Sequence, residues 1–284
     1  MNTSSLVNAA VAVTGGAHGI GRAIAERFAY AGARVAIGDL DANAAHAAAA
    51  AIGAGATAAA LDVTDAKGFA AFLDAAEQRH GPLGVMINNA GIDWIGPFHQ
   101  EPDEITRREI EVNLIGTIIG SRLAVQRMLP RQHGHLVNIA SGVGRVPLPG
   151  SSVYSATKHG IVGLTESLRL EYRGSGIRFT LVQPAQVETA MIDGQPRPRM
   201  LPVVTPDEVA RSVLEAVRNN KFEIWVPASQ AITFKLSNLL PRPARESLMR
   251  AMGIGRIASD ADQAARAAYH QRMFGEPKRK HQNQ

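Results

Sequence analysis

The chain has 284 residues, a formal net charge of +5 at pH 7 and no cysteine. Its length suffices for one large α/β domain with a full core, and the lack of cysteine excludes disulfides and thiolate metal sites. Much of the positive charge lies after residue 240 without an aromatic platform for bases, which argues against a nucleic-acid partner. The sequence has neither a secretory signal pattern nor about 20 consecutive apolar residues, so we expect a cytoplasmic protein. We also expect no metal site.

Short apolar runs alternate with helical stretches along the first 228 residues. The pattern predicts strands, in chain order, at 8–14, 34–39, 57–61, 83–88, 135–140, 177–183 and 222–226. It predicts helices at 19–31, 41–51, 65–80, 102–129, 152–173 and 206–218. Because parallel neighbours need crossover connections, this alternation predicts a doubly wound, mostly parallel seven-stranded sheet with helices on both faces.

Glycine and polar residues follow six of the predicted strands. They are Gly15 to Gly21, Asp39, Asp62, Asn88 to Gly91, Ser141 and Pro184. Ligands of such sheets bind beyond the carboxyl ends of the strands. The glycine turn precedes a helix, so a pyrophosphate is expected at that helix N-terminus, with Gly15, Gly19 and Gly21 allowing a tight turn, close approach and close packing.

Tyr154 and Lys158 lie four residues apart, and Ser141 precedes them by thirteen residues. On a helix, residues i and i+4 share a face, so the Lys158 ammonium can lie near the Tyr154 phenol and lower its pKa. A phenol shifted in this way is a usable base. The Tyr-x-x-x-Lys pair alone is a weak signal, but its combination with the glycine turn, Asn88 to Gly91 and Ser141 indicates a redox enzyme.

These motifs together resemble the short-chain dehydrogenase/reductase family, in its single-domain Rossmann branch, over residues 8–228. The resemblance rests on Thr14-Gly15-x-x-x-Gly19-Ile20-Gly21, Asp62-Val63, Asn88-Asn89-Ala90-Gly91, Asn113, Ser141, Tyr154-x-x-x-Lys158 and Pro184. It implies an NAD(P)-dependent oxidoreductase that interconverts a secondary alcohol and its ketone. It also implies a homodimer or homotetramer, formed through the helices at 102–129 and 152–173.

The resemblance assigns four catalytic residues. Tyr154 would take the hydroxyl proton as hydride leaves for the nicotinamide, and Lys158 would lower the Tyr154 pKa and bind the nicotinamide ribose. Ser141 would hold the substrate oxygen. Asn113 would anchor a water that links Lys158 to solvent, although it could also be an ordinary buried polar residue of its helix.

The cofactor-binding set comprises Gly15, His18, Gly19, Ile20, Asp39, Asp62, Val63, Asn89, Ala90, Gly91, Tyr154, Lys158, Pro184, Val187 and Thr189. Asp39 at the end of the second strand favours NAD over NADP, because a carboxylate accepts ribose hydroxyls and repels a 2′-phosphate. Either Asp39 or Asp41 could instead cap the next helix. Asn89 could be structural, and Thr189 is expected on the carboxamide, although Ala185 stands where the family usually has glycine.

The loop 190–205, which contains Met191, is expected to close over the substrate. Together with Trp94 and Val143 from other segments, it is expected to form an apolar pocket. This composition favours a hydrophobic alcohol or ketone, although the same residues could be ordinary core. Residues 229–284 are expected to form a C-terminal helical extension and a disordered basic tail. The extension could cover the substrate mouth, pack between subunits or make peripheral contact with an anionic membrane.

Two other functions remain open from the sequence. One is an NADPH-dependent carbonyl reductase, which Asp39 disfavours. The other is a catalytically idle nucleotide-sensing protein, which the intact set of Asn113, Ser141, Tyr154 and Lys158 disfavours because a pure binder does not need the phenol.

Overall fold

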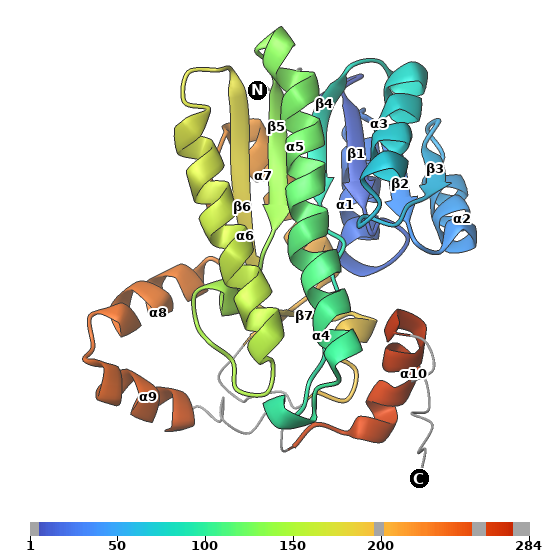
Figure 1. Cartoon of the computed structure of the whole chain (residues 1–284). Coiled ribbons are helices and arrows are strands. Elements are labelled where there is room, and N and C mark those ends of the chain that lie inside the picture. The colour runs from blue at the N-terminus through green and yellow to red at the C-terminus, as the bar shows by residue number, and fades with distance from the viewer. Residues whose placement is uncertain (1–5, 196–201, 252–259, 275–284) are drawn as a thin grey trace.

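The computed structural model describes residues 6–195, 202–251 and 260–274. Residues 196–201 of the predicted substrate loop and the basic residues at 278–280 lie outside this range. Seven strands form one parallel sheet in the order β3-β2-β1-β4-β5-β6-β9 (Figure 1). The strands are β1 (Ala10–Thr14), β2 (Arg34–Asp39), β3 (Thr57–Ala60), β4 (Leu83–Asn88), β5 (Gly134–Ile139), β6 (Ile177–Pro184) and β9 (Glu223–Val226). This arrangement confirms the predicted fold class.

Helices cover both faces of the sheet because successive side chains of each strand point to opposite faces. In β1, Val11 and Val13 belong to the core beneath α1 (Gly19–Tyr30), α2 (Ala42–Ile52) and α7 (Pro206–Asn219). Ala12 faces the other way, into the core shared with α3 (Ala66–His80) and α5 (Gly116–Met128). The long helix α6 (Ser152–Glu171) lies beside α5 on that second face (Figure 1).

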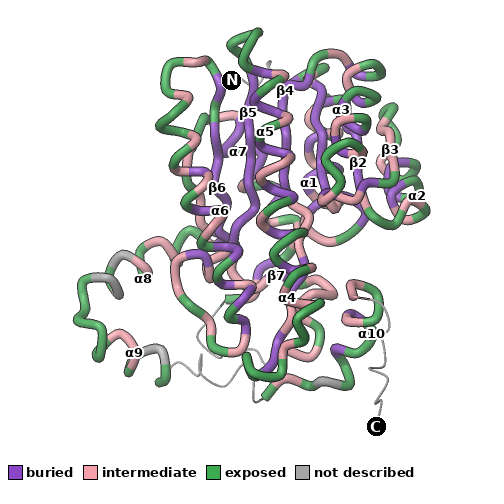
Figure 2. The backbone as a smooth tube through the Cα atoms, viewed as in Figure 1, coloured by how far each residue is buried: buried purple, intermediate pink, exposed green. Residues whose placement is uncertain are grey.

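The strand order reverses between β1 and β4, which pair with each other although β2 and β3 lie between them in sequence. The following helices cross to opposite faces at this point, so a crevice opens beyond the carboxyl ends of the strands. Figure 2 shows the central strands buried along most of their length, whereas the edge strand β3 is only partly buried.

The predicted helix at 102–129 is observed, but it contains a π-helical turn that the sequence did not predict. It consists of α4 (Asp103–Ile110), a π-helical turn (Glu111–Ile115) and α5. Asn113 lies within that turn and exchanges hydrogen bonds with both backbone groups of Ile92, outside the helix. Single π-helical turns inside α-helices often occur at functional sites.

Elements after β6 were only partly predicted. A small parallel sheet pairs β7 (Gln186–Val187) with β8 (Val203–Val204), which the sequence assigned to a loop. The C-terminal extension contains α8 (Ser229–Asn238), α9 (Arg242–Ala251) and α10 (Gln263–Phe274). The sequence predicted a helical extension without bounds for its helices, and α10 was not predicted as a separate helix. Of the helices in the described ranges, none has the length and apolar character needed to cross a bilayer.

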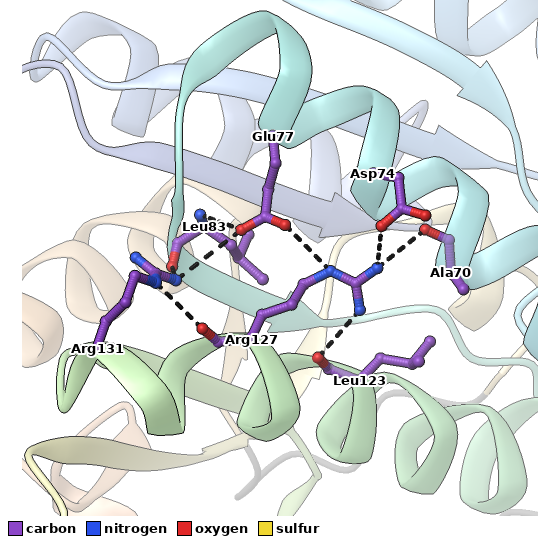
Figure 3. Close-up of polar contacts among 7 residues, drawn as sticks. All are labelled: Ala70, Asp74, Glu77, Leu83, Leu123, Arg127 and Arg131. Atoms are coloured by element: carbon purple, nitrogen blue, oxygen red, sulfur yellow. Dashed lines mark hydrogen bonds and ion pairs between the residues drawn. The ribbon is translucent and has the colours of Figure 1, made fainter.

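Arginines fasten α3 to α5 at the amino ends of the strands (Figure 3). The Arg127 guanidinium pairs with Asp74, lies 3.2 Å from Glu77 and also donates to the carbonyl of Ala70. Arg131 donates to the carbonyl of Leu83, where β4 begins, at 2.8 Å. The network therefore ties two neighbouring helices to a strand at the end of the sheet opposite the crevice.

Candidate active site

A cavity of about 840 Å³ lies beyond the carboxyl ends of the strands. Nearly all of the predicted site residues line it: Gly15, His18, Gly19, Ile20, Asp39, Asp62, Val63, Asn89, Ala90, Gly91, Ser141, Val143, Tyr154, Lys158, Pro184, Val187, Thr189 and Met191. Asn113 is fully buried behind the wall. Trp94 is not part of the wall, since its ring packs so closely over Gly96 that a Cβ there would lie 2.5 Å from it.

The glycine turn fits a phosphate group. Gly15 has a φ of +62°, which disfavours other residues, and a Cβ at Gly21 would lie 2.1 Å from the Gly15 carbonyl oxygen. The turn leads into α1, whose first turn carries no acidic side chain and whose N-cap, His18, makes no side-chain capping bond. The helix N-terminus therefore faces the cavity with its positive dipole end uncompensated, as an anion site requires.

Asp39 and Asp41 have separate tasks. The Asp41 carboxylate caps α2 by accepting from the Ala44 amide at 3.0 Å. The Asp39 carboxylate accepts from the Ala17 amide, in the glycine turn, at 3.0 Å. Helix capping is thus assigned to Asp41, and Asp39 holds the glycine turn with its carboxylate in the cavity wall.

Asn89 binds backbone groups of the neighbouring strand end. Its side-chain nitrogen donates to the carbonyls of Thr14 at 2.9 Å and Gly15 at 3.1 Å. The Thr14 hydroxyl in turn accepts from the amides of Asn89 and Ala90. These bonds join the ends of β1 and β4, so Asn89 supports the shape of the crevice through its side chain.

Asp62, which the resemblance assigns to the adenine, lines the cavity. Partial burial works to raise its pKa, but hydrogen bonds from Thr64 and the charge of Arg108 outweigh burial and leave the pKa below its usual value. Arg108 lies 3.3 Å from this carboxylate. Asp62 is therefore ionised and held in place at the edge of the cavity.

Tyr154, Lys158 and Ser141 come together in the middle of the cavity wall. The Lys158 Nζ lies 5.4 Å from the centre of the Tyr154 ring and donates to the Ile139 carbonyl at 3.0 Å. Ser141 hydrogen-bonds the Tyr154 side chain, and its hydroxyl also accepts from the Val143 amide. A substrate oxygen could meet Ser141 and the phenol at the same point.

The expected lowering of the Tyr154 pKa is wrong for this structure. Burial raises the pKa of Tyr154 well above its usual value, and the nearby Asp93, Tyr269 and Glu109 raise it further, while the Ser141 hydrogen bond opposes them. Burial also lowers the pKa of Lys158 to about 8. One turn of helix brings the amine close to the ring, but the loss of water around the phenol outweighs that proximity.

Asn113 and Gly91 lie next to Lys158. A Cβ added at Gly91 would lie 3.3 Å from the Asn113 Oδ1 and 3.6 Å from the Lys158 Nζ. Asn113 also donates to the Thr157 hydroxyl at 3.3 Å. The amide is thus committed to the Ile92 backbone and to α6, and its role in a water relay stays a prediction.

Thr189 lies against the glycine turn, since a Cβ at Gly19 would come within 3.0 Å of the Thr189 Cγ2. Ala185, where the family usually has glycine, donates its amide to the Val226 carbonyl at 2.8 Å. The segment after β6 therefore keeps a regular path along β9 and brings Thr189 to the cavity.

Several cavity residues were missed from the sequence. They are Asp93 in the loop after β4, Trp225, Gln230, Thr233 and Phe234 in β9 and α8, and Tyr269, Arg272 and Met273 in α10. The last three recur at the i, i+3, i+4 spacing of one helix face. The run Ala264 to Ala268 after Asp262 favours a helix, but nothing in the sequence shows where that helix packs.

Two buried carboxyl groups lie near Tyr154 and Lys158. Burial raises the pKa of Asp93 to about 7, against the opposing effect of Arg266, and raises that of Glu109 to about 9, with the Asp93 charge adding to it. Glu109 accepts from the Trp94 amide, and its other oxygen has no partner among the described residues. Such perturbed groups beside a cavity are typical of functional sites.

Comparisons with known proteins agree with this site. The family described as "short chain dehydrogenase" matches residues 9–199. The chain is 36% identical to a 1-deoxy-11-beta-hydroxypentalenate dehydrogenase of Streptomyces exfoliatus, over 76% of this chain and 82% of that protein. It is 35% identical to 2-(S)-hydroxypropyl-CoM dehydrogenase 3 of Xanthobacter autotrophicus (83% and 92% covered) and 37% identical to a cis-4-hydroxycyclohexanecarboxylate dehydrogenase of Sinomonas cyclohexanicum (71% and 86%).

Solved structures give the same result. A short chain dehydrogenase/reductase from Burkholderia phymatum in complex with NAD superposes with a TM-score of 0.76 at 25% identity, covering 82% of this chain and 94% of that chain. A 3-ketoacyl-(acyl-carrier-protein) reductase from Brucella melitensis complexed with NADH has a TM-score of 0.73 at 26% identity (78% and 98% covered).

Proposed function

The chain belongs to the short-chain dehydrogenase family, and we propose that it is an NAD-linked dehydrogenase of hydrophobic secondary alcohols in which Tyr154 transfers the hydroxyl proton. The observation that carries this proposal is a single cavity that joins the glycine turn of α1 to Ser141, Tyr154 and Lys158. A cofactor phosphate and a substrate hydroxyl can therefore be held in one space.

The residues fit a nicotinamide dinucleotide. The α1 N-terminus and Gly15 would hold the pyrophosphate, and Asp39 would receive the adenosine ribose. Asp62 and Val63 would border the adenine. When bound, the oxidised cofactor supplies the hydride acceptor and a positive charge beside the phenol.

Ser141 and Tyr154 would hold the substrate oxygen while the carbinol hydrogen leaves as hydride. In oxidation the ionised form of Tyr154 would accept the hydroxyl proton, and in reduction the neutral phenol would return it to the carbonyl oxygen. The raised pKa of Tyr154 suits the donor role, because the phenol keeps its proton at neutral pH. The Lys158 Nζ lies 5.4 Å from the centre of the ring, where its positive charge would stabilise the phenolate that accepts the proton in oxidation and that forms in reduction.

The walls near Tyr154 favour an apolar substrate. Apolar side chains lining this part include Val143, Val146, Leu148, Met191, Ile192, Trp225, Phe234 and Met273. Two of the relatives are named for alicyclic hydroxy acids, which combine an apolar ring with a secondary hydroxyl. Arg242, Arg245 and Arg272 also line the cavity, so an acid group on the substrate is compatible with its charge.

Asp39 separates this proposal from an NADPH-dependent carbonyl reductase, because a carboxylate at the end of β2 repels a 2′-phosphate. The catalytically idle alternative is disfavoured by the convergence of Ser141, Tyr154 and Lys158 in the cavity. A homodimer or homotetramer and peripheral membrane contact remain predictions from the sequence.

A spectrophotometric screen tests the proposed function. Purified protein is incubated with NAD or NADP and a panel of alicyclic secondary alcohols, alicyclic hydroxy acids and small polar sugars, while reduced cofactor is followed by its absorbance. We expect turnover with NAD and the alicyclic compounds. Turnover confined to sugars would overturn the substrate class, and no turnover with any compound in either direction would count against the activity.

A further inference from the structure

The C-terminal helix α10 is fastened to two loops of the site by a buried arginine. Arg266 is fully buried and donates to the carbonyls of Asp93 at 3.2 Å, Met191 at 3.1 Å and Asp193 at 3.3 Å. Asp93 belongs to the loop after β4, whereas Met191 and Asp193 belong to the loop after β7. One guanidinium thus joins both loops to α10.

Tyr269 adds a second attachment one turn further along the helix. Its hydroxyl accepts from the Asp93 amide at 3.0 Å, and its ring lies 5.4 Å from the Arg266 guanidinium carbon. Tyr269 is almost fully buried. A buried guanidinium is costly unless it is paired, and both terminal nitrogens of Arg266 donate to carbonyls, whereas its Nε has no partner among the described residues. Three carbonyls and an aromatic face therefore indicate a specific contact.

The start of α10 is fitted to the same loop. The Asp262 amide donates to the Gly194 carbonyl at 2.8 Å, and the Asp262 carboxylate caps the helix through the amides of Ala264 and Ala265. Gly194 has a φ of +71°, and a Cβ there would lie 2.6 Å from the Asp262 carbonyl oxygen. Only glycine allows this approach, so the loop and the helix are matched to each other.

The helix face that these contacts orient lines the cavity. Tyr269, Arg272 and Met273 all belong to the cavity wall together with Asp93 and Met191, which lie in the loops that Arg266 holds. A movement of α10 would therefore remove its own part of the cavity wall. It would also release the two loops that contain Asp93 and Met191. The glycine turn and Asp39 line another part of the cavity and belong to β1, α1 and β2.

We propose that α10 is a specificity element of the substrate site and that Arg266 is the positioning residue that holds it against the loops at 91–95 and 190–195. The part of the cavity that α10 walls takes the apolar portion of the substrate. The specificity role rests on the proposed function, because it is measured with substrates. The attachment of α10 to the two loops does not depend on that function.

Hydrogen–deuterium exchange on the full-length protein tests the attachment without any substrate. In Arg266→Met we expect exchange in 91–95 and in 190–195 to become at least tenfold faster, with exchange in β1 and β4 unchanged. Arg79→Met, the same change at an exposed arginine of α3, should leave both loops as in the wild type. Unchanged protection of both loops in Arg266→Met would overturn the proposal.

Steady-state kinetics test the specificity role. We expect Arg266→Met to raise KM for the largest alcohols about tenfold or more, with KM for NAD within twofold and with little effect on the smallest alcohols. Arg266→Lys should recover part of the loss, because an ammonium can reach some of the same carbonyls. Met273→Ala should shift the preference toward bulkier alcohols by enlarging the wall.

Each outcome separates the two proposals. If the wild type turns over no alcohol, the proposed function fails, and the exchange experiment still decides whether Arg266 holds α10. If turnover is found but KM for every alcohol is unchanged in Arg266→Met and Met273→Ala, the specificity role is wrong. Should Arg266→Met fail to fold, Tyr269→Phe removes only the bond to the Asp93 amide and gives the same two readouts.

Discussion

Charged side chains gather at both ends of the central sheet, in very different surroundings. At the amino ends of the strands, Arg127 and Asp74 form an ion pair in which the aspartate side chain is 61% exposed (Figure 3). At the carboxyl ends, Asp93, Glu109 and Lys158 are almost completely buried. The first group ties helices together at the surface, and the second borders the cavity.

The contrast shows how burial changes the energetic cost and the pKa of a charged side chain. Water screens the Arg127 network, so its pairs add little stability each and cost little to form. Around Tyr154, burial raises the pKa values of Asp93 and Glu109 and lowers that of Lys158. A protein retains such unfavourable groups where their reactivity is useful, so we expect mutations to affect activity at one end and stability at the other.

The largest expected effect is on turnover in Lys158→Met. Loss of the amine removes the positive charge beside the Tyr154 ring, and kcat/KM should fall by about 10² or more. Because the folded pKa of Lys158, about 8, lies below its usual 10.5, the buried ammonium costs stability at neutral pH and below. The melting temperature at pH 7 should therefore not decrease, and a large decrease would contradict this view of the site.

Glu109→Gln should change how stability depends on pH. The folded pKa of Glu109, about 9, lies above the usual 4.5, so its stabilising effect is complete below pH 4.5 and is lost as the pH rises to about 9. Each unit of pKa difference corresponds to about 1.4 kcal/mol. Thermal unfolding from pH 5 to 9 should show a smaller loss of stability in the variant.

The matched control for this experiment is Glu111→Gln, at an exposed glutamate two residues away. It should keep the wild-type pH dependence. If the Glu109 and Glu111 variants gave the same profile as the wild type, Glu109 would be ionised in the folded protein across this range.

Asp39→Ser should change the choice of cofactor by a smaller amount. Removing the carboxylate takes away a ribose acceptor and a charge that repels a 2′-phosphate, so the ratio of NAD to NADP affinity should fall about tenfold, or about 1.4 kcal/mol. Tryptophan fluorescence titration with both cofactors measures this ratio. Asp65→Ser, at the cap of α3, should leave it unchanged, and an unchanged ratio in Asp39→Ser would remove Asp39 from the ribose site.

The smallest effect is expected from Arg127→Met at the other end of the sheet. The change removes the ion pairs to Asp74 and Glu77, and we expect a loss of about 1 kcal/mol in the free energy of unfolding. The kcat should stay within twofold of the wild type. A larger loss of activity than of stability would show that the two ends of the sheet are coupled.

The sequence was sufficient for the fold, and nearly all of the site residues predicted from it line the cavity. Periodicity and glycine spacing are local properties, and they placed β2 (Arg34–Asp39) and β4 (Leu83–Asn88) at their observed bounds. The π-helical turn at Asn113 was missed because it depends on partners such as Ile92 that are distant in sequence. The docking of α10 through Arg266 was missed for the same reason.

The pKa of Tyr154 marks a different limit. Helical spacing correctly placed Lys158 near the ring, but the direction of the shift depends on burial and on Asp93, Tyr269 and Glu109, which come from three other segments. Only the assembled site shows how these contributions balance.

The most direct test of the central claim is a single-turnover measurement of hydride transfer in Tyr154→Phe, at saturating NAD and with the best alcohol of the screen. Tyr30→Phe is the control, because that tyrosine is 93% exposed on α1. We predict that Tyr154→Phe reduces cofactor at least 10²-fold more slowly than the wild type, with its affinity for NAD within twofold, and that Tyr30→Phe is unchanged. A wild-type rate in Tyr154→Phe would contradict the account.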